Sequence, residues 1–288
     1  MRFLLLFLLF FSSLIGLEVS ISDSTISNGR TIYIEFEKKR NVNYQKIIFD
    51  KKNYTIFTHP NDDKKMYAFL PLSYYQKPNY QEVKIVYQEG TQKKEQFISI
   101  EIKDGNYKKE KIVVQKSKVN PTSKKVKKRT AKEYKEAMDI YSTITEKSYI
   151  SSEFIVPINS KITSDFGKAR VYNNTLNGYH SGTDFRAKIG TPIKASNDGV
   201  VILAKDRFYA GNSIIIDHGQ GVYSCYYHLS KFNVISGDKV YKSQIIGLSG
   251  DTGRITGPHL HFSMRVGGIQ VDPLQFIKLI NNNLFKKV

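Results

Sequence analysis

The segment Pro258-His-Leu-His-Phe-Ser-Met-Arg-Val266 alternates apolar and polar side chains, which is the pattern of a half-buried β-strand. Successive side chains of a strand point to opposite faces. One face is therefore expected to enter a core with the apolar side chains Leu260, Phe262, Met264 and Val266. The opposite face carries His259 and His261 side by side. The segment predicts a rigid strand that presents two imidazole groups.

Other histidines lie upstream in a recognisable order. His180-Ser-Gly-Thr-Asp184 places a histidine and an aspartate four residues apart, and Tyr227-His228-Leu229 adds a further imidazole. Together with the His-x-His pair, these side chains offer the nitrogen and oxygen ligands that zinc accepts. Three protein ligands would leave one position open, as in catalytic sites where zinc makes water a nucleophile near neutral pH. The alternative is a set of unrelated surface or core histidines, and three such motifs together favour a single site.

No glutamate follows Glu153 in the sequence. This part of the chain therefore lacks the His-Glu-x-x-His motif, in which glutamate is the general base. A histidine or an aspartate must assist the water instead, and histidine has the unperturbed pKa better suited to that task.

These motifs resemble those of the lysostaphin-type (LytM-type) zinc endopeptidases, over roughly residues 155 to 275. The matching segments are Gly178-Tyr-His180-Ser-Gly-Thr-Asp184-Phe-Arg-Ala, Gly190-Thr-Pro-Ile-Lys-Ala, Tyr227-His228-Leu-Ser, Gly250-Asp-Thr-Gly253 and Thr256-Gly-Pro-His259-Leu-His261-Phe. The resemblance implies hydrolysis of peptide bonds in peptidoglycan. The chain is similar in particular to the cell-shape endopeptidases of Gram-negative bacteria. This similarity implies that the D-alanyl-diaminopimelate cross-link is the bond that is cut.

The resemblance also implies a role for each site residue. His180, Asp184 and His261 match the ligands of Zn²⁺, and His228 and His259 match the pair that polarises water and stabilises the oxyanion.

His218 matches no ligand position, and we expect it in a turn or at the rim of the site. Some relatives have lost ligands and act only as regulators of other wall hydrolases. None of the five functional positions is replaced here, so a non-catalytic peptidoglycan-binding regulator is the alternative rather than the leading hypothesis.

The N-terminus reads as a secretory signal over residues 1–17. Met1-Arg2 is followed by the apolar run Phe3–Phe11 and then by Ser12-Ser-Leu-Ile-Gly16, which includes small residues. The apolar character fades before the roughly 20 residues that a membrane span needs. An uncleaved anchor is the alternative, because leucine is a poor match near the cleavage site. We expect no stable transmembrane span, and secretion across the inner membrane to a periplasmic or wall-associated location.

Residues 18–105 predict a separate β-rich module. Its strand-like segments are rich in β-branched and aromatic residues and are separated by turn residues. They are Thr31–Glu37, Gln45–Phe49, Tyr67–Leu72, Glu82–Tyr87 and Phe97–Ile102. Several short strands at this spacing indicate a sandwich. We expect the module to recruit the enzyme to a wall or cell-shape protein partner rather than to cover the cleft. Its single histidine, His59, is expected in solvent.

Residues 106–150 predict a basic linker followed by a helix. The run Lys124-Lys-Val-Lys-Lys-Arg129 is the densest part of a chain with 44 Lys and Arg against 26 Asp and Glu. Such a run is usually a flexible, solvated linker. A nucleic-acid-binding protein is a third alternative, but a secreted enzyme meets anionic wall polymers instead, so we expect no nucleic-acid partner.

Beyond this run, an amphipathic helix from Thr130 to about Ser142 is expected to pack through residues at spacings of three and four. These residues are Ala131, Tyr134, Met138 and Tyr141.

The overall expectation is a mainly β chain. It comprises an N-terminal β-sandwich-like module, the basic linker and helix, and a LytM-type antiparallel β peptidase domain over residues 151–288. Peptidoglycan peptide stems and cross-links are the expected binding partners.

Overall fold

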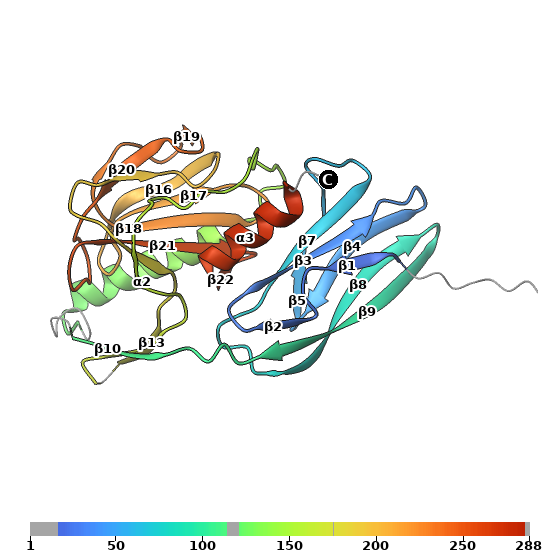
Figure 1. Ribbon diagram of the computed structural model, residues 1–288, viewed down its shortest axis with the longest axis horizontal. Helices are drawn as coiled ribbons and strands as arrows, with labels where there is room; N and C mark the ends of the chain where they lie inside the picture. Colours follow the sequence, from blue (N-terminus) through green and yellow to red (C-terminus); the bar gives the residue numbers. More distant parts are fainter. Residues whose placement is uncertain (1–16, 114–120, 175, 286–288) are drawn as a thin grey trace, which may run out of the picture.

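The computed structural model describes residues 17–113, 121–174 and 176–285. It is mainly β, as expected, and two β-rich parts lie one after the other along the long axis of the molecule (Figure 1). Most of the predicted signal segment, residues 1–16, lies outside the described residues. Neither of the helices in the described part of the chain is long and apolar enough to cross a membrane.

The N-terminal part is a sandwich of two sheets. One sheet has the strand order β1-β3-β7-β6, with bounds Val19–Ile21, Thr31–Glu37, Lys65–Pro71 and Phe57–Thr58. The other has the order β2-β9-β8-β4-β5, with bounds Thr25–Ser27, Gln92–Lys103, Asn79–Glu89, Val42–Phe49 and Lys52–Tyr54. Their facing side chains, such as Ile34, Leu70 and Ile85, form one buried cluster. The five strands expected from β-branched and aromatic runs correspond to β3, β4, β7, β8 and β9.

The C-terminal part is built on a ten-stranded sheet whose central path is β11-β14-β21-β18-β17-β16-β19. The strands of the path span Ile162–Ser164, Thr183–Arg186, His259–Val266, Val222–Phe232, Gly211–Asp217, Gly199–Arg207 and Lys239–Val240. The remaining three are β15 (Pro192–Lys194), β20 (Ile245–Ser249) and β22 (Ile269–Val271). In β21 the side chains of Leu260, Phe262 and Met264 are fully buried, as the alternation predicts. The strand is not half-buried, however, because His261 and Ser263 on its other face are buried as well.

A small third sheet lies beside the C-terminal part. Strand β10 (Lys109–Ile112) pairs in parallel with β12 (Ala169–Tyr172), which pairs antiparallel with β13 (Leu176–Tyr179). Strand β10 follows directly from the sandwich and runs along the lower edge of the molecule in Figure 1. Part of the expected linker is therefore a strand that pairs with the peptidase part.

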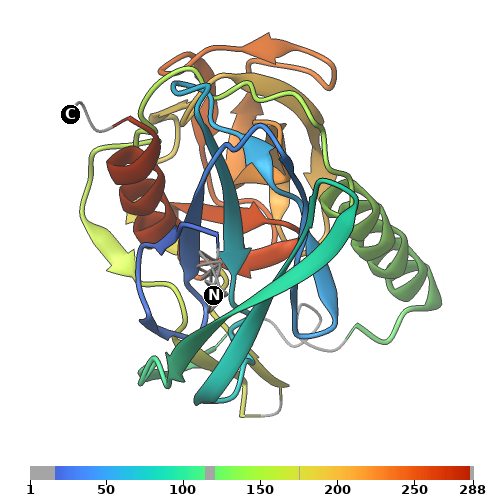
Figure 2. The same cartoon turned by 90° about the vertical axis from the view of Figure 1, so that its right-hand side faces the viewer.

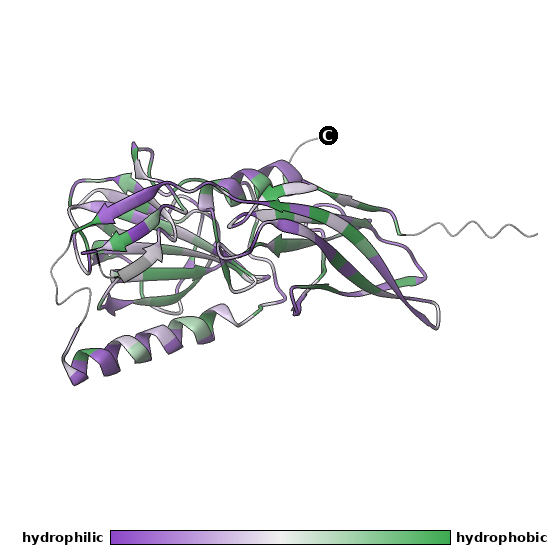
Figure 3. Ribbon diagram, turned by 90° about the horizontal axis from the view of Figure 1, so that it is seen from below, coloured by the Kyte–Doolittle hydropathy of each residue, from purple (hydrophilic) through white to green (hydrophobic). Residues whose placement is uncertain are grey.

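Helix α2 spans Lys124–Tyr141 and begins six residues before the expected start, so the basic run forms its first turns. These turns are coloured as hydrophilic in Figure 3. The expected packing face is only partly right. Tyr134 is 66% exposed and Ala131 is exposed too, whereas Glu133, Ala137 and Tyr141 are buried. The face is shifted because the Glu133 carboxylate accepts hydrogen bonds from Arg129 Nε and the Phe208 amide.

Helix α3 (Pro273–Leu284) lies on the opposite side of the molecule from α2 (Figure 2) and packs between the two parts. The ring of Phe276 meets that of Phe69 in β7 edge to face, with centroids 5.1 Å apart. The side chain of Gln275 bonds both the amide and the carbonyl of Thr31 in β3. The sandwich and the peptidase sheet therefore share buried apolar side chains across their interface.

Candidate metal centre and active site

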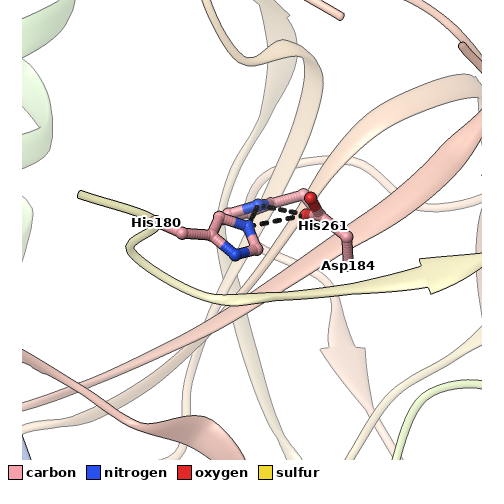
Figure 4. A group of neighbouring side chains, drawn as sticks. All are labelled: His180, Asp184 and His261. Atoms are coloured by element: carbon pink, nitrogen blue, oxygen red, sulfur yellow. Dashed lines mark hydrogen bonds and ion pairs between the residues drawn. The ribbon is translucent and has the colours of Figure 1, made fainter. Parts of the chain in front are cut away.

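Three predicted ligands converge at the junction of β14 and β21. Asp184 in β14 is the direct antiparallel partner of His261 in β21, and His180 lies just before β14. Asp184 Oδ1 lies 2.8 Å from both His180 Nε2 and His261 Nδ1, and these two nitrogens are 3.0 Å apart (Figure 4). All three residues are buried, and they form a group that can hold a metal ion.

The orientation of His180 shows that a cation fits this group. Its Nδ1 lies 2.7 Å from the carbonyl oxygen of Asp165, which only accepts, so Nδ1–H donates and Nε2 keeps its lone pair. Two acceptor atoms, His180 Nε2 and Asp184 Oδ1, thus face each other at 2.8 Å. A cation between them relieves this repulsion. Two imidazole nitrogens and one carboxylate oxygen are also a donor set typical of catalytic zinc sites.

The charges around the group keep the donors in their ligating forms. Burial raises the pKa of the Asp184 carboxyl, but its close contacts with the imidazoles of His180 and His261 outweigh this effect and hold that pKa well below its usual range. The other oxygen, Oδ2, accepts a hydrogen bond from Arg170 Nη2 at 3.0 Å. Burial lowers the pKa of His261 to about 4, so this imidazole is neutral at neutral pH.

Two further predicted residues face each other beside the metal group. The rings of His228 and His259 have centroids 5.0 Å apart, and His259 Nε2 lies 3.5 Å from Asp184 Oδ1. His228 Nδ1 lies 2.8 Å from the carbonyl oxygen of Thr252, and His259 Nδ1 lies 2.8 Å from that of Gly257. Each Nδ1 therefore donates, which leaves both Nε2 atoms free for a reacting group. Burial, followed by the proximity of the His261 and His259 imidazoles, lowers the pKa of His228 to about 3.

The structure thus brings together all five residues predicted for the site. Two adjoining pockets surround them. One has Asp184, His228 and His259 in its wall, and the other, of about 190 Å³, has His228 and His261. A larger cavity of about 580 Å³ lies between the sandwich and α3, away from these histidines.

Several side chains around the site were not predicted from the sequence. Arg170 joins Asp184 to Glu110 of β10, with Nε 3.0 Å from Glu110 Oε2. A glutamate therefore does lie near the metal group, although it comes from before the peptidase domain. Arg254 and Tyr172 contribute to both pockets. No spacing pattern marks these residues, because they come from separate strands and loops.

Two histidines outside the site are buried, contrary to expectation. His218 is fully buried, with Nδ1 2.7 Å from the Asp198 carbonyl oxygen and Nε2 2.7 Å from Ser224 Oγ. It is a core residue rather than a rim residue. His59 is only 8% exposed and packs its ring against the edge of Tyr67, so it is not in solvent. In both cases a residue from another strand or loop satisfies or covers the ring.

Comparison with known proteins agrees with this geometry. The profile of peptidase family M23 matches residues 178–273. Peptidoglycan DD-endopeptidase ShyA of Vibrio cholerae serotype O1 is 46% identical over 122 residues, which are 41% of this chain and 28% of that protein. The chain therefore spans less than a third of the length of this relative.

Solved structures extend the likeness. A putative M23 peptidase from Pseudomonas aeruginosa is 25% identical with a TM-score of 0.66, and the match covers 88% of this chain and 95% of that one. This likeness includes the sandwich as well as the peptidase sheet. The catalytic domain of lysostaphin from Staphylococcus simulans is 39% identical with a TM-score of 0.38, over 42% of this chain and 93% of that domain. The chain therefore contains a domain of peptidase family M23, over residues 178–273.

Proposed function

We propose that this protein is a zinc-dependent endopeptidase that hydrolyses peptide cross-links in peptidoglycan. The observation that carries the proposal is the buried convergence of His180 Nε2, Asp184 Oδ1 and His261 Nδ1 within 3.0 Å of one another. These three residues would hold the zinc ion. Zinc bound there would supply Lewis-acid chemistry, which polarises a scissile carbonyl and makes water a competent nucleophile near neutral pH.

The chain's own residues would manage the proton and the developing negative charge. His228 is fixed by donation from Nδ1 to the Thr252 carbonyl, so its Nε2 can accept a proton from the attacking water. His259, whose Nε2 faces the same space beside Asp184, would as an imidazolium donate from Nε2 to the oxyanion of the tetrahedral intermediate. Arg170 would orient Asp184 by occupying its second oxygen.

The substrate assignment rests on the named relative. ShyA is a peptidoglycan DD-endopeptidase, and the segment of this chain that matches family M23 contains the five site residues. We therefore propose the D-alanyl-diaminopimelate cross-link as the substrate, for wall remodelling or cell shape. A peptidoglycan substrate requires an extracytoplasmic location, to which the basic and apolar N-terminal segment would direct the chain. Recruitment by a protein partner through the sandwich is part of the same proposal.

Digestion of purified diaminopimelate-type peptidoglycan, followed by mass spectrometry of the fragments, tests this function. The expected result is conversion of cross-linked dimers to monomers that end in D-alanine. The conversion should be abolished by a chelator and restored by added zinc. His261→Ala protein serves as the matched control without a complete metal group. Binding of peptidoglycan without release of fragments would instead favour the non-catalytic regulator, and release of other fragments would refute the proposed bond.

A further inference from the structure

Arg254 lies in the loop between β20 and β21, and the backbone of this loop is closely held. The Arg254 amide donates to the Tyr209 carbonyl at 2.8 Å. The preceding Gly253 has a φ of +86°, and a Cβ there would lie 2.4 Å from the Gly211 amide nitrogen, so the close approach requires glycine. The same loop supplies the Thr252 carbonyl that orients His228. The backbone at Arg254 is therefore held in position by the same loop that orients His228.

The guanidinium of Arg254 lies between two aromatic rings. Its central carbon is 4.4 Å from the ring centroid of Tyr172 and 4.7 Å from that of Tyr209. Stacking of this kind uses the flat faces of the guanidinium, whereas its N–H donors lie in the plane and stay available to a planar partner. The two rings thus hold the group in a fixed orientation before any ligand arrives.

The cation has no anionic partner within the part of the chain that the structure describes, where Arg254 forms no ion pair. Arg170, which lines the same two pockets, differs because both Glu110 and Asp184 neutralise it. Arg254 is half-buried. A half-buried arginine whose planar donors lack a carboxylate is suited to bind one from a ligand, in the bidentate manner typical of arginine.

The position of Arg254 places such a ligand at the reacting centre. Arg254 contributes to both pockets that surround the site, and so does His228. The first of these pockets also includes Asp184 and His259, and the second includes His261. A carboxylate bound by Arg254 would therefore belong to a residue at, or next to, the scissile bond.

We infer that Arg254 binds a free carboxylate of the substrate beside the scissile bond and so makes the enzyme selective for cross-links that carry one. This inference rests on the proposed function. In a D-alanyl-diaminopimelate cross-link, the carbon attached to the scissile nitrogen carries a free carboxylate. The interior of a glycine bridge has none, and an amidated cross-link presents a neutral carboxamide. Arg254 thus provides a physical basis for choosing among bonds that the metal group alone does not distinguish.

The test uses two soluble cross-linked muropeptide dimers that differ only in a carboxylate or a carboxamide at that carbon. The zinc-loaded wild-type protein is expected to favour the carboxylate about 10- to 100-fold in kcat/KM, the range typical of a charge-assisted hydrogen-bonded pair. Arg254→Gln is expected to reduce this preference to about twofold, mainly by raising KM for the carboxylate substrate. Arg254→Lys keeps the charge but not the planar donors, so it should retain only part of the preference.

Arg40→Gln is the matched control, because Arg40 is an exposed arginine of the sandwich and its loss removes the same charge. Its preference should equal that of the wild type. Zinc content and thermal unfolding of each variant report whether the site remains folded. Equal cleavage of both dimers by the wild type overturns the role of Arg254 and leaves the proposed function standing. An equal loss on both dimers in Arg254→Gln also overturns it, and cleavage of neither dimer by the wild type overturns the proposed function together with the inference.

Discussion

Replacement of His218 by asparagine should change how the stability of the protein depends on pH. Burial lowers the pKa of His218 from 6.5 to about 4, and the Asp198 carbonyl and charge oppose this only in part. Because the folded pKa lies below the unfolded one, the unfolded chain takes up the proton first as the pH falls. The stability that the neutral ring contributes is therefore present above pH 6.5 and is lost as the pH falls toward 4.

The size of the effect follows from the same two values. One unit of pKa difference corresponds to about 1.4 kcal/mol, so the wild-type protein should lose about 2 kcal/mol of unfolding free energy between pH 7 and pH 5 through this residue. Asparagine at position 218 can still donate to the Asp198 carbonyl but does not titrate. The wild-type advantage over His218→Asn should therefore shrink by about 2 kcal/mol over that interval.

Urea unfolding of both proteins at pH 7 and pH 5 measures this difference. A chelator keeps both proteins metal-free, so that release of metal at low pH does not contribute. Titration of the site histidines is common to the two proteins and cancels in the comparison. A wild-type advantage that is the same at both pH values would refute the view that His218 is a neutral core residue.

Three further outcomes are expected. His261→Ala should abolish stoichiometric zinc binding, measured by elemental analysis, together with activity, and full hydrolysis by this variant would contradict the metal group. His228→Ala should keep zinc while kcat falls on the order of 10²-fold or more, whereas an unchanged kcat would remove His228 from the mechanism. Phe69→Ala should lower the unfolding free energy by about 3–5 kcal/mol, because it removes the ring that packs against Phe276 and leaves a cavity. The control is Phe97→Ala, at a half-exposed position of the same sandwich, and denaturant unfolding measures both variants. Equal effects of the two phenylalanine substitutions would show that the sandwich and the peptidase sheet do not stabilise each other.

The parts of the fold that were predictable are those in which local pattern and burial agree. Strand β21 alternates along its whole length, and its apolar face is fully buried. Strand β3 has the bounds that its run of β-branched and aromatic residues predicts. In such strands one face packs on a core, so the period of the sequence is sufficient to assign the direction of each side chain.

The metal group was predictable for a different reason. The spacing between His180 and Asp184, together with the His-x-His pair, offers the imidazole and carboxylate ligands that zinc accepts. The resemblance to LytM-type peptidases implies that His261 is the ligand from that pair. The pairing of Asp184 with His261 across β14 and β21 then depends on sheet register, which the motif does not contain.

The residues that were missed owe their positions to partners in other strands or loops. His218 is buried because Asp198 and Ser224 satisfy its two nitrogens. Glu133 faces inward on α2 because the Phe208 amide needs an acceptor there. A polar side chain is buried only where a partner compensates for lost water, and local periodicity carries no information about that partner.

In strand β18, which carries His228, sequence periodicity also fails to predict the side-chain directions in the active site. Consecutive residues of a regular strand point to opposite faces, so Tyr227 and His228 should not line one pocket. Between the pairs Ile214–Tyr226 and Asn212–Leu229, however, β18 has two residues where β17 has one, and His228 has a φ of +63°. This β-bulge turns both side chains into the same pocket, where Tyr227 stacks on His261 with ring centroids 5.5 Å apart and His228 faces His259.

The positive φ of His228 is costly for a residue other than glycine. Two hydrogen bonds hold His228 in this conformation, one from its amide to the Ala210 carbonyl and one from its ring to the Thr252 carbonyl. The sequence motif therefore identifies the residues of the site. It does not contain the β-bulge, and only the bulge lets two adjacent residues of one strand point into the same pocket.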